Sequence, residues 1–269
     1  SQAGYSLLLS VPGYDEVREA AELTAMIRRG VDGIILVGGR HDPSLFALLK
    51  ARGIPYVIVW SVHPDHPSIG FDHRRAMVQV ATALIDLGHT RIGAIMTDQA
   101  ENERVRERML GIGDALAARR LPFPAAYQRT TSLGLKTGGE AMAELMALPE
   151  PPTAVICVNG VVAAGAVLEC QRRGLSIPGD VSIVGFSASE LGSTLTPSIT
   201  SVETPVSEMG ERAVRFLLER MAGGELTLNE TLPTPMVLRQ SMGPPSHRAS
   251  ARQANAHGQR ENAIGRRRG

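Results

Sequence analysis

Polar side chains that could bind a small molecule come shortly after two apolar, β-branched runs of this sequence. Asn159 follows the run 154–158, and Ser187 follows the run 181–184 after a Gly-Phe pair. Such runs are typical of parallel strands buried on both faces, so both side chains are expected at carboxyl ends of strands. Ligands of open α/β sheets bind outside those ends. An amide and a hydroxyl there would suit a hydroxylated ligand, although Asn159 could instead cap the next helix.

The sequence favours neither a serine hydrolase nor a metal site. Residues 185–189, Gly-Phe-Ser-Ala-Ser, nearly match the G-x-S-x-G turn of a serine hydrolase, but the last glycine is missing. The only histidines that follow are His247 and His257, in a segment without hydrophobic periodicity. Three histidines and Asp65 gather within 63–73, without the helical or hairpin scaffold that fixes metal ligands. The sequence therefore predicts no catalytic residues, no metal site and no cofactor.

The composition is that of an ordinary globular protein. The chain has 269 residues, of which 43% are hydrophobic and 20% charged. No apolar run approaches the roughly 18 residues of a membrane span, and no secretory leader opens the chain. Cys157 and Cys170 lie in apolar segments and are expected to be reduced core residues. These features favour a cytoplasmic protein without a membrane partner.

The last segment, residues 244–269, differs from the rest. It holds six arginines against one glutamate, a net charge of +5, which leaves −4 for the preceding residues. It lacks periodicity and is rich in Ala, Gln, Asn and Arg, so we expect a disordered basic tail. The negative body is not a surface that would bind nucleic acid by itself.

Strand-like and helix-like segments alternate along the chain, as in an α/β fold with parallel sheets. The expected strands are residues 5–10, 33–37, 56–60, 92–96, 154–158 and 181–184, with extended segments at 195–203 and 232–240. The expected helices are residues 17–29, 43–51, 74–87, 102–119, 138–148, 162–170 and 206–222. Two groups of βα units followed by a return helix and strand predict two Rossmann-like lobes and a hinged cleft. The predicted lobes are residues 1–94 plus 203–228, and residues 95–202 plus 229–243.

Nine segments, in order through residues 4–241, resemble the effector-binding core of the lactose-repressor/galactose-repressor family of bacterial transcription regulators. They are GYSLLL (4–9), RRGVDGIILVG (28–38), IPYVIV (54–59), ALIDLGHTRIGAI (83–95), RMLGIGDAL (108–116), PTAVICVNGVVAAGAV (152–167), GLSIPGDVSIVGF (174–186), LTPSITSVETPVSEMGERAV (195–214) and LPTPMVLRQS (232–241).

The resemblance implies a type I periplasmic-binding-protein-like fold, with two lobes joined by three crossovers and a small-molecule effector between them. It implies a homodimer that binds operator DNA through a helix-turn-helix headpiece, which this chain lacks. The resemblance further implies that the first βα unit of the core is missing ahead of Tyr5. A periplasmic solute receptor of the same fold is the alternative.

The resemblance also assigns ligand contacts. Arg108, three residues before Gly111, takes the place of an arginine that binds effector hydroxyl or carboxylate groups; a solvated helix face is the alternative. Asp72 matches a family aspartate or caps the helix 74–87, and Leu133 falls roughly where some relatives carry an aromatic. Trp60, the only tryptophan, could stack on a sugar or other ligand ring, or cover the surface between the predicted lobes.

Two departures from the family pattern bear on the ligand. Gly160 stands where an aspartate usually follows the asparagine, and Ser187 and Ala188 replace aspartates after the Gly-Phe pair. Carboxylates bind vicinal sugar hydroxyls well, so their loss disfavours a simple free hexose. Because Arg108 is kept, the pattern favours an acidic ligand. A regulator that has lost effector binding is a further alternative.

Overall fold

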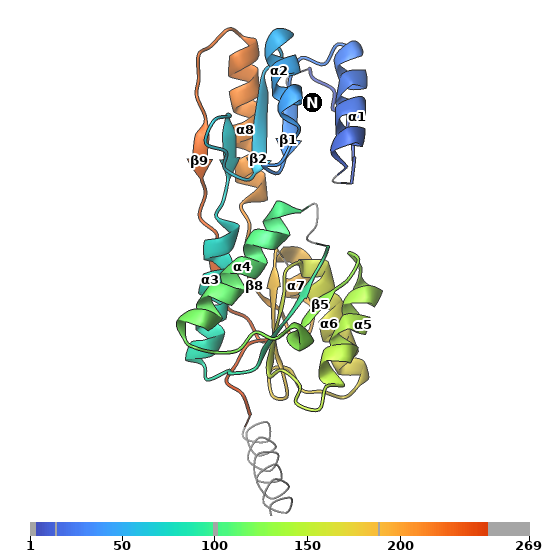
Figure 1. Cartoon of the computed structure of the whole chain (residues 1–269), viewed down its shortest axis with the longest axis vertical. Helices are drawn as coiled ribbons and strands as arrows, with labels where there is room; N and C mark the ends of the chain where they lie inside the picture. Colours follow the sequence, from blue (N-terminus) through green and yellow to red (C-terminus); the bar gives the residue numbers. More distant parts are fainter. Residues whose placement is uncertain (1–3, 14, 99–101, 188, 247–269) are drawn as a thin grey trace, which may run out of the picture. The chain divides into compact units, whose positions relative to one another are not determined.

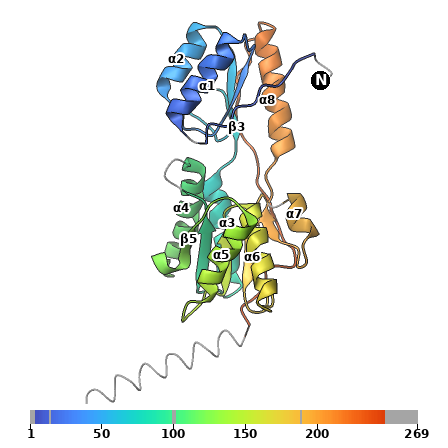
Figure 2. The same ribbon diagram turned by 90° about the vertical axis from the view of Figure 1, so that its right-hand side faces the viewer.

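The computed structural model describes residues 4–13, 15–98, 102–187 and 189–246, and it divides into two compact units. Unit 1 comprises Ser1–Asp72, Ala100–Arg104 and Pro205–Pro233, and unit 2 comprises His73–Gln99, Val105–Thr204 and Thr234–Gly269. Figures 1 and 2 show both units as ribbons. The lobe boundaries predicted from the sequence stay a prediction. From residue 247 onward, the predicted basic tail lies outside the described residues.

Unit 1 is built on a parallel sheet with strand order β1-β2-β3-β9. Its strands are β1 (Ile34–Val37), β2 (Tyr56–Trp60), β3 (Ser68–Gly70) and β9 (Asn229–Thr231). Helices α1 (Glu16–Arg28) and α2 (Pro43–Ala51) lie on one face of this sheet and α8 (Val206–Met221) on the other (Figures 1 and 2). The unit is therefore a three-layer α/β sandwich.

Hydrophobic periodicity and helix capping explain these layers. Asp15 and Asp42 accept hydrogen bonds from the first backbone N–H groups of α1 and α2, which are the groups that lack partners within a helix. On α8, Met209, Ala213, Phe216 and Leu217 recur at helical spacing and pack on β2 and β3. Burying one large apolar side chain of this kind contributes about 1.5–3 kcal/mol.

Unit 2 contains a six-stranded sheet with order β10-β8-β7-β6-β4-β5, parallel except for β10. Its strands are β4 (Ile92–Met96), β5 (Gln128–Thr130), β6 (Ala154–Cys157), β7 (Ser182–Phe186), β8 (Thr200–Val202) and β10 (Met236–Val237). The helices are α3 (His73–Asp86), α4 (Glu103–Ala118), α5 (Leu135–Met146), α6 (Gly160–Arg172) and the short α7 (Ser189–Thr194), with a 3-10 turn η1 (Ala125–Tyr127). Helices α3 and α4 cover one face, and α5 and α6 the other (Figure 1).

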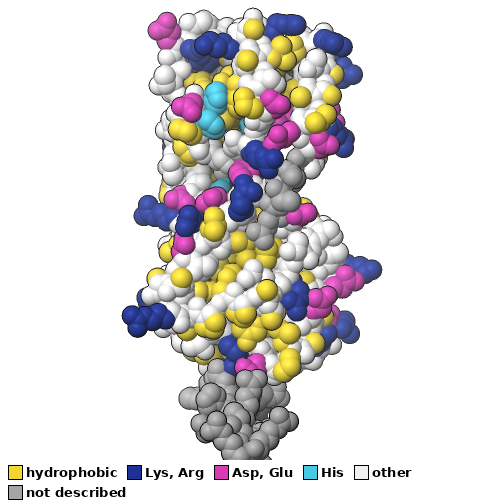
Figure 3. Space-filling view, viewed as in Figure 1, with side chains coloured by type: hydrophobic (Ala, Val, Ile, Leu, Met, Phe, Trp, Pro, Cys, Tyr) yellow, Lys and Arg dark blue, Asp and Glu magenta, His cyan; other side chains and the backbone are white. Residues whose placement is uncertain are grey.

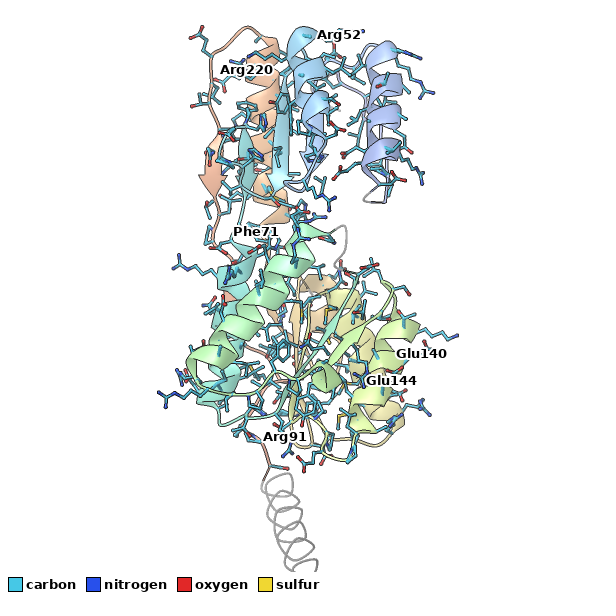
Figure 4. The ribbon with its side chains drawn as sticks, in the orientation of Figure 1. Arg52, Phe71, Arg91, Glu140, Glu144 and Arg220 are labelled. Carbon is cyan, nitrogen blue, oxygen red and sulfur yellow. The ribbon has the colours of Figure 1, made fainter. Side chains whose placement is uncertain are left out.

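Glycines allow α5 and α6 to pack with their backbones in contact. A Cβ on Gly165 would lie 2.1 Å from the carbonyl oxygen of Leu135, and one on Gly138 would lie 2.6 Å from that of Val162. On the opposite side of α5, Glu140 and Glu144 project outward (Figure 4). This packing fixes the start of α6, which directly follows β6.

The sequence-based expectations fail at some short or isolated segments. Residues 5–10 form no strand, and Leu7 and Leu9 are 87% and 81% exposed. The physical reason is pairing: β1 pairs with β2 alone, and no described strand lies beside residues 5–10. The extended segment 232–240 was expected as one piece, yet β9 precedes it and only β10 lies within it. None of the described helices has the length and apolarity needed to span a membrane.

Candidate functional site

The strand order of unit 2 reverses between β4 and β6. From β4 the chain goes through α4 to β5 on one side, and then through α5 to β6 on the other side of β4. In open α/β sheets, such a reversal opens a crevice at the carboxyl ends of the strands, where ligands bind. Asn159 stands at this edge, two residues after β6 ends.

Arg108 reaches this edge from α4 and is 7% exposed. Its Nη1 donates a hydrogen bond to the carbonyl oxygen of Val158 at 2.7 Å, and its Nε donates to Nδ1 of His73 at 3.2 Å. A buried guanidinium needs such partners, because an unpaired buried charge is very costly. The solvated-face alternative for Arg108 is therefore excluded by its burial.

Gly111 explains how α4 brings Arg108 so close to the sheet. A Cβ at residue 111 would lie 2.2 Å from the carbonyl oxygen of Arg74 and 3.0 Å from the Cβ of Met77. The glycine thus lets the backbones of α3 and α4 touch, one turn away from Arg108. The Arg-x-x-Gly spacing in the sequence therefore has a steric basis.

Phe186 and His73 complete the surroundings of Arg108. The guanidinium carbon lies 3.7 Å from the centroid of the Phe186 ring, a cation–π contact, and the His73 ring lies 5.9 Å from the same ring. Sequence reasoning placed neither aromatic side chain beside Arg108. Phe186 sits in a strand pattern that reads as core, and the pairing of His73 with α4 has no signal in sequence spacing.

Asn159 caps α6. Its Oδ1 accepts a hydrogen bond from the backbone N–H of Val161 at 2.8 Å, as one of the two sequence interpretations expected. The amide Nδ2 has no hydrogen bond to another described residue. The cap therefore orients the side chain while two N–H donors stay available at the strand edge.

Ser187 follows β7 in a left-handed backbone conformation, with φ of 54°. This region is uncommon for residues other than glycine, and strain of this kind gathers at functional sites. The backbone N–H of Ser187 donates to the carbonyl oxygen of Val202, and its hydroxyl shares a 2.8 Å hydrogen bond with that of Thr204. Thr204, rather than a histidine, is thus its partner; Ala188 lies outside the described residues.

In unit 1, Trp60 ends β2 at the carboxyl edge of the sheet, also with a positive φ, of 72°. Its ring makes an edge contact with Phe71 at 5.5 Å, and the Arg104 guanidinium lies 5.9 Å from the ring centroid. Its backbone N–H points to Sδ of Met209 at 3.2 Å. The indole is thus partly buried in protein contacts, and both sequence interpretations of Trp60 remain open.

Glu103 is a residue at this edge that sequence reasoning missed. Its Oε1 accepts hydrogen bonds from the backbone N–H of Gly39 at 2.8 Å and from the hydroxyl of Ser61 at 3.2 Å. It thereby ties together the loops that follow β1 and β2. In sequence, Glu103 stands in a run of charged residues, where nothing distinguishes it from a solvated glutamate.

Asp72 and Leu133, the two remaining predicted ligand residues, lie in different units, Asp72 in unit 1 and Leu133 in unit 2. Asp72 is exposed, immediately precedes α3 and is the last residue of unit 1 before the chain enters unit 2. Leu133 is 61% exposed and lies between β5 and α5. Since β4 separates β5 from β6, Leu133 follows a strand two places away from that of Asn159. Their ligand roles stay predictions.

The described residues contain no group of three or more His, Cys, Asp or Glu side chains placed to hold a metal ion. His63 accepts a hydrogen bond at Nδ1 from the backbone N–H of Asp65, and His66 stacks on Phe46 with ring centroids 3.8 Å apart. At the end of β6, burial raises the pKa of the Cys157 thiol far above its ordinary value, which keeps it protonated and unreactive.

Comparison with known proteins bears on this site. The model of the periplasmic binding protein-like domain matches residues 81–242. The transcriptional regulator reg1 of Streptomyces lividans, named as a helix-turn-helix type, is 33% identical over 254 residues, which are 90% of this chain and 73% of that protein.

Solved structures agree. The transcription regulator GntR from Chromobacterium violaceum superposes with a TM-score of 0.83 at 26% identity, covering 89% of each chain. A regulator of the LacI family from Enterococcus faecium, solved with bound ribose, superposes with a TM-score of 0.73 at 25% identity, covering 83% of each chain. The mixed α/β fold with parallel sheets is thus that of type I periplasmic-binding-protein-like cores.

Proposed function

Because this chain belongs to the lactose-repressor/galactose-repressor (LacI) family of bacterial transcription regulators, we propose that it is the effector-sensing core of a DNA-binding regulator. It binds a sugar, a sugar acid or a related metabolite in the cleft between two lobes. Effector binding changes the operator affinity of a helix-turn-helix headpiece outside these residues. The protein works as a cytoplasmic homodimer. The observation that carries the proposal is the buried Arg108 at the strand reversal of unit 2.

The residues at this edge suit a ligand rich in oxygen acceptors. Arg108 supplies a planar cation, and Asn159 supplies two amide N–H donors. Gly160 and Ser187 bring no carboxylate to the ends of β6 and β7. A carboxylate or phosphate on the ligand would complement Arg108 without repulsion from either residue. This favours a sugar acid or sugar phosphate over a free hexose, whereas the Enterococcus faecium relative was solved with ribose.

The mechanism is a shift between two populations of lobe arrangements. A ligand moves such an equilibrium only by its difference in affinity for the two states. Effector contacts to Arg108 favour one arrangement, the paired first lobes of the dimer change orientation, and the headpieces bind operator more strongly or more weakly. Linkage then requires operator DNA to change effector affinity by the same factor.

A thermal-shift screen with D-ribose, D-glucose, D-gluconate and glucose 6-phosphate tests effector binding. A ligand that binds only the folded protein stabilises it by about 2.7 kcal/mol when its concentration is 100 times its Kd. This stabilisation raises the melting temperature. Arg108→Ala should abolish this increase. Arg119→Ala, at an exposed arginine that directly follows the same helix, is the matched control and should retain it. An unchanged increase in Arg108→Ala would overturn the assigned role of Arg108.

DNA binding by the chain together with its natural upstream residues tests whether the protein is a DNA-binding regulator. Selection from a random oligonucleotide library should yield an operator, and the effector should shift its binding midpoint severalfold. A secretory leader upstream and no DNA binding would support the alternative, a periplasmic solute receptor. The curated relative reg1 is named as a transcriptional regulator, which favours the first outcome.

A further inference from the structure

A groove runs along the side of α4 that faces away from Arg108. It has a volume of about 260 Å³ and is lined by α4 from Arg106 to Asp114, by Phe123 and by Gln128 of β5. We call it the α4 groove. An α-helix turns about 100° per residue, so Arg106, Leu110 and Gly113 lie on the helix face opposite Arg108, and Met109 lies beside that face. Hydrophobic side chains are exposed on this side of unit 2 (Figure 3).

The α4 groove is open because residue 113 has no side chain. An ideal Cβ at Gly113 meets no atom within 4 Å, whereas one at Gly111 would collide with the α3 backbone. Glycine inside a helix costs about 0.5–1 kcal/mol relative to alanine. At Gly111 this cost has a steric reason, but at Gly113 no packing requires it. Gly113 instead leaves the groove empty between Met109, Leu110 and Phe123.

The lining is apolar with one cation that lacks a partner. Met109 and Phe123 line the groove, and Leu110 is 43% exposed beside it. Asp114 is held by Arg74 through two hydrogen bonds of 2.5 and 3.0 Å, so its charge is compensated. Arg106 is exposed and has no hydrogen bond or ion pair to another described residue. Gln128 donates its Nε2–H to the carbonyl of Phe123, which leaves its Oε1 as an acceptor.

We propose that the α4 groove is a second ligand site, which takes a small carboxylate with a flat or branched apolar body. The carboxylate pairs with the guanidinium of Arg106, whose planar fork matches two oxygens. The apolar body lies over Gly113 against Met109 and Phe123, where thioether and aromatic contacts are favourable. The volume is just below the range of about 300–1,000 Å³ of ordinary ligand pockets, which limits the ligand to about one ring.

Benzoate is the probe, and isothermal titration on the whole chain is the measurement. Benzoate should bind the wild type, and benzamide, which has the same shape without the charge, should bind at least tenfold more weakly. Gly113→Leu fills the groove and should weaken benzoate binding at least tenfold. Gly210→Leu is the matched control, because Gly210 is also a helical glycine with open space at its Cβ. It should leave benzoate affinity unchanged, while Arg106→Gln should reduce it.

The proposal would be overturned by no binding of benzoate, by equal binding of benzamide, or by unchanged benzoate binding in Gly113→Leu or Arg106→Gln. Arg108→Ala separates this site from the effector site. It should keep benzoate binding, and loss of that binding would place benzoate elsewhere and contradict the proposal. Gly113→Leu should in turn keep the response to the effector found by thermal shift. Arg106→Gln changes only an exposed side chain, so it tests the site even if Gly113→Leu is poorly folded.

Discussion

The guanidinium carbon of Arg108 lies 3.7 Å from the centroid of the Phe186 ring, so a cation of α4 stacks on the last residue of β7. A desolvated cation–π contact contributes about 2 kcal/mol. Together with the hydrogen bond to Val158, it orients the charge at the strand edge before any ligand arrives. Such preorganisation lowers the cost of binding, because the side chain loses little freedom when the ligand is bound.

Arg108→Lys should therefore weaken effector binding although the charge is kept. Lysine has neither the planar face that stacks on Phe186 nor the forked donors that match two oxygens. The loss of one charge-assisted hydrogen bond, about 1.5–3 kcal/mol, corresponds to a roughly 10- to 150-fold rise in Kd. Isothermal titration with the effector identified by thermal shift measures it. Full affinity in the lysine variant would show that charge alone is sufficient.

Gly111→Ala and Gly113→Ala should change stability in opposite directions. At Gly111 the new methyl group would lie 2.2 Å from a backbone oxygen, and overpacking of this kind costs about 1–3 kcal/mol. At Gly113 the methyl group meets open space, and alanine should add about 0.5–1 kcal/mol. Urea unfolding followed by circular dichroism compares the two. Equal effects would contradict the backbone contact between α3 and α4.

The elements that could be predicted from the sequence are those with a strong local signal, either a pattern of apolar residues or a helix cap. The run 154–158, the helix at 206–222 and the capped starts of α1 and α2 carry local signals strong enough to define them. The three-residue strands β3 and β5 carry no such period. They exist because a neighbouring strand pairs with them, which is information outside the segment. Residues 5–10 show the converse: a good strand pattern without a partner forms no strand.

The candidate site divides in the same way. Arg108 and Asn159 were identified because residue type, strand ends and family resemblance agree. Glu103 and His73 were missed, because each acts through a partner far away in sequence, Gly39 and Arg108 respectively. Hydrogen bonds across such separations leave no spacing pattern in a single sequence.

His89 should make unit 2 less stable as the pH falls. It is 1% exposed, its Nε2–H donates to the carbonyl of Gly243, and its Nδ1 shares a hydrogen bond with the Thr153 hydroxyl. Burial lowers the pKa of His89 in the folded state, more than the Gly243 carbonyl raises it. Its contribution is thus complete above the unfolded pKa of about 6.5 and is lost as pH falls through the lower folded pKa.

The measurement is urea unfolding of wild type and His89→Gln at pH 8, 6 and 5. Glutamine does not titrate, and at pH 8 the variant should be about 1–3 kcal/mol less stable, because buried hydrogen bonds are lost. The difference should shrink as the pH is lowered. A difference that is constant with pH would mean that His89 is not kept neutral by the fold.

His41 in unit 1 should show the opposite pH dependence. Its side chain is buried, its Nδ1 lies 2.9 Å from Oε2 of Glu19, and its Nε2 lies 2.9 Å from the carbonyl of Gly38. Burial by itself lowers the pKa of His41, but the hydrogen bond and charge of Glu19 and the Gly38 carbonyl together raise it above its ordinary value. With two acceptors the charged ring is favoured. Its stabilisation is complete below about pH 6.5 and is lost as pH rises through the raised folded pKa.

Glu19→Gln should therefore destabilise unit 1 more at pH 6 than at pH 9, by about 1–3 kcal/mol at the lower pH. Trp60 is the only tryptophan and lies in unit 1, so its fluorescence during urea unfolding follows this unit. Glu16→Gln is the control, because Glu16 is in the same first turn of α1 and pairs with the exposed Arg40. An exposed ion pair contributes less than about 1 kcal/mol, so this variant should change little at either pH. If Glu19→Gln loses no more stability than Glu16→Gln at either pH, the Glu19–His41 pair does not hold a charged histidine.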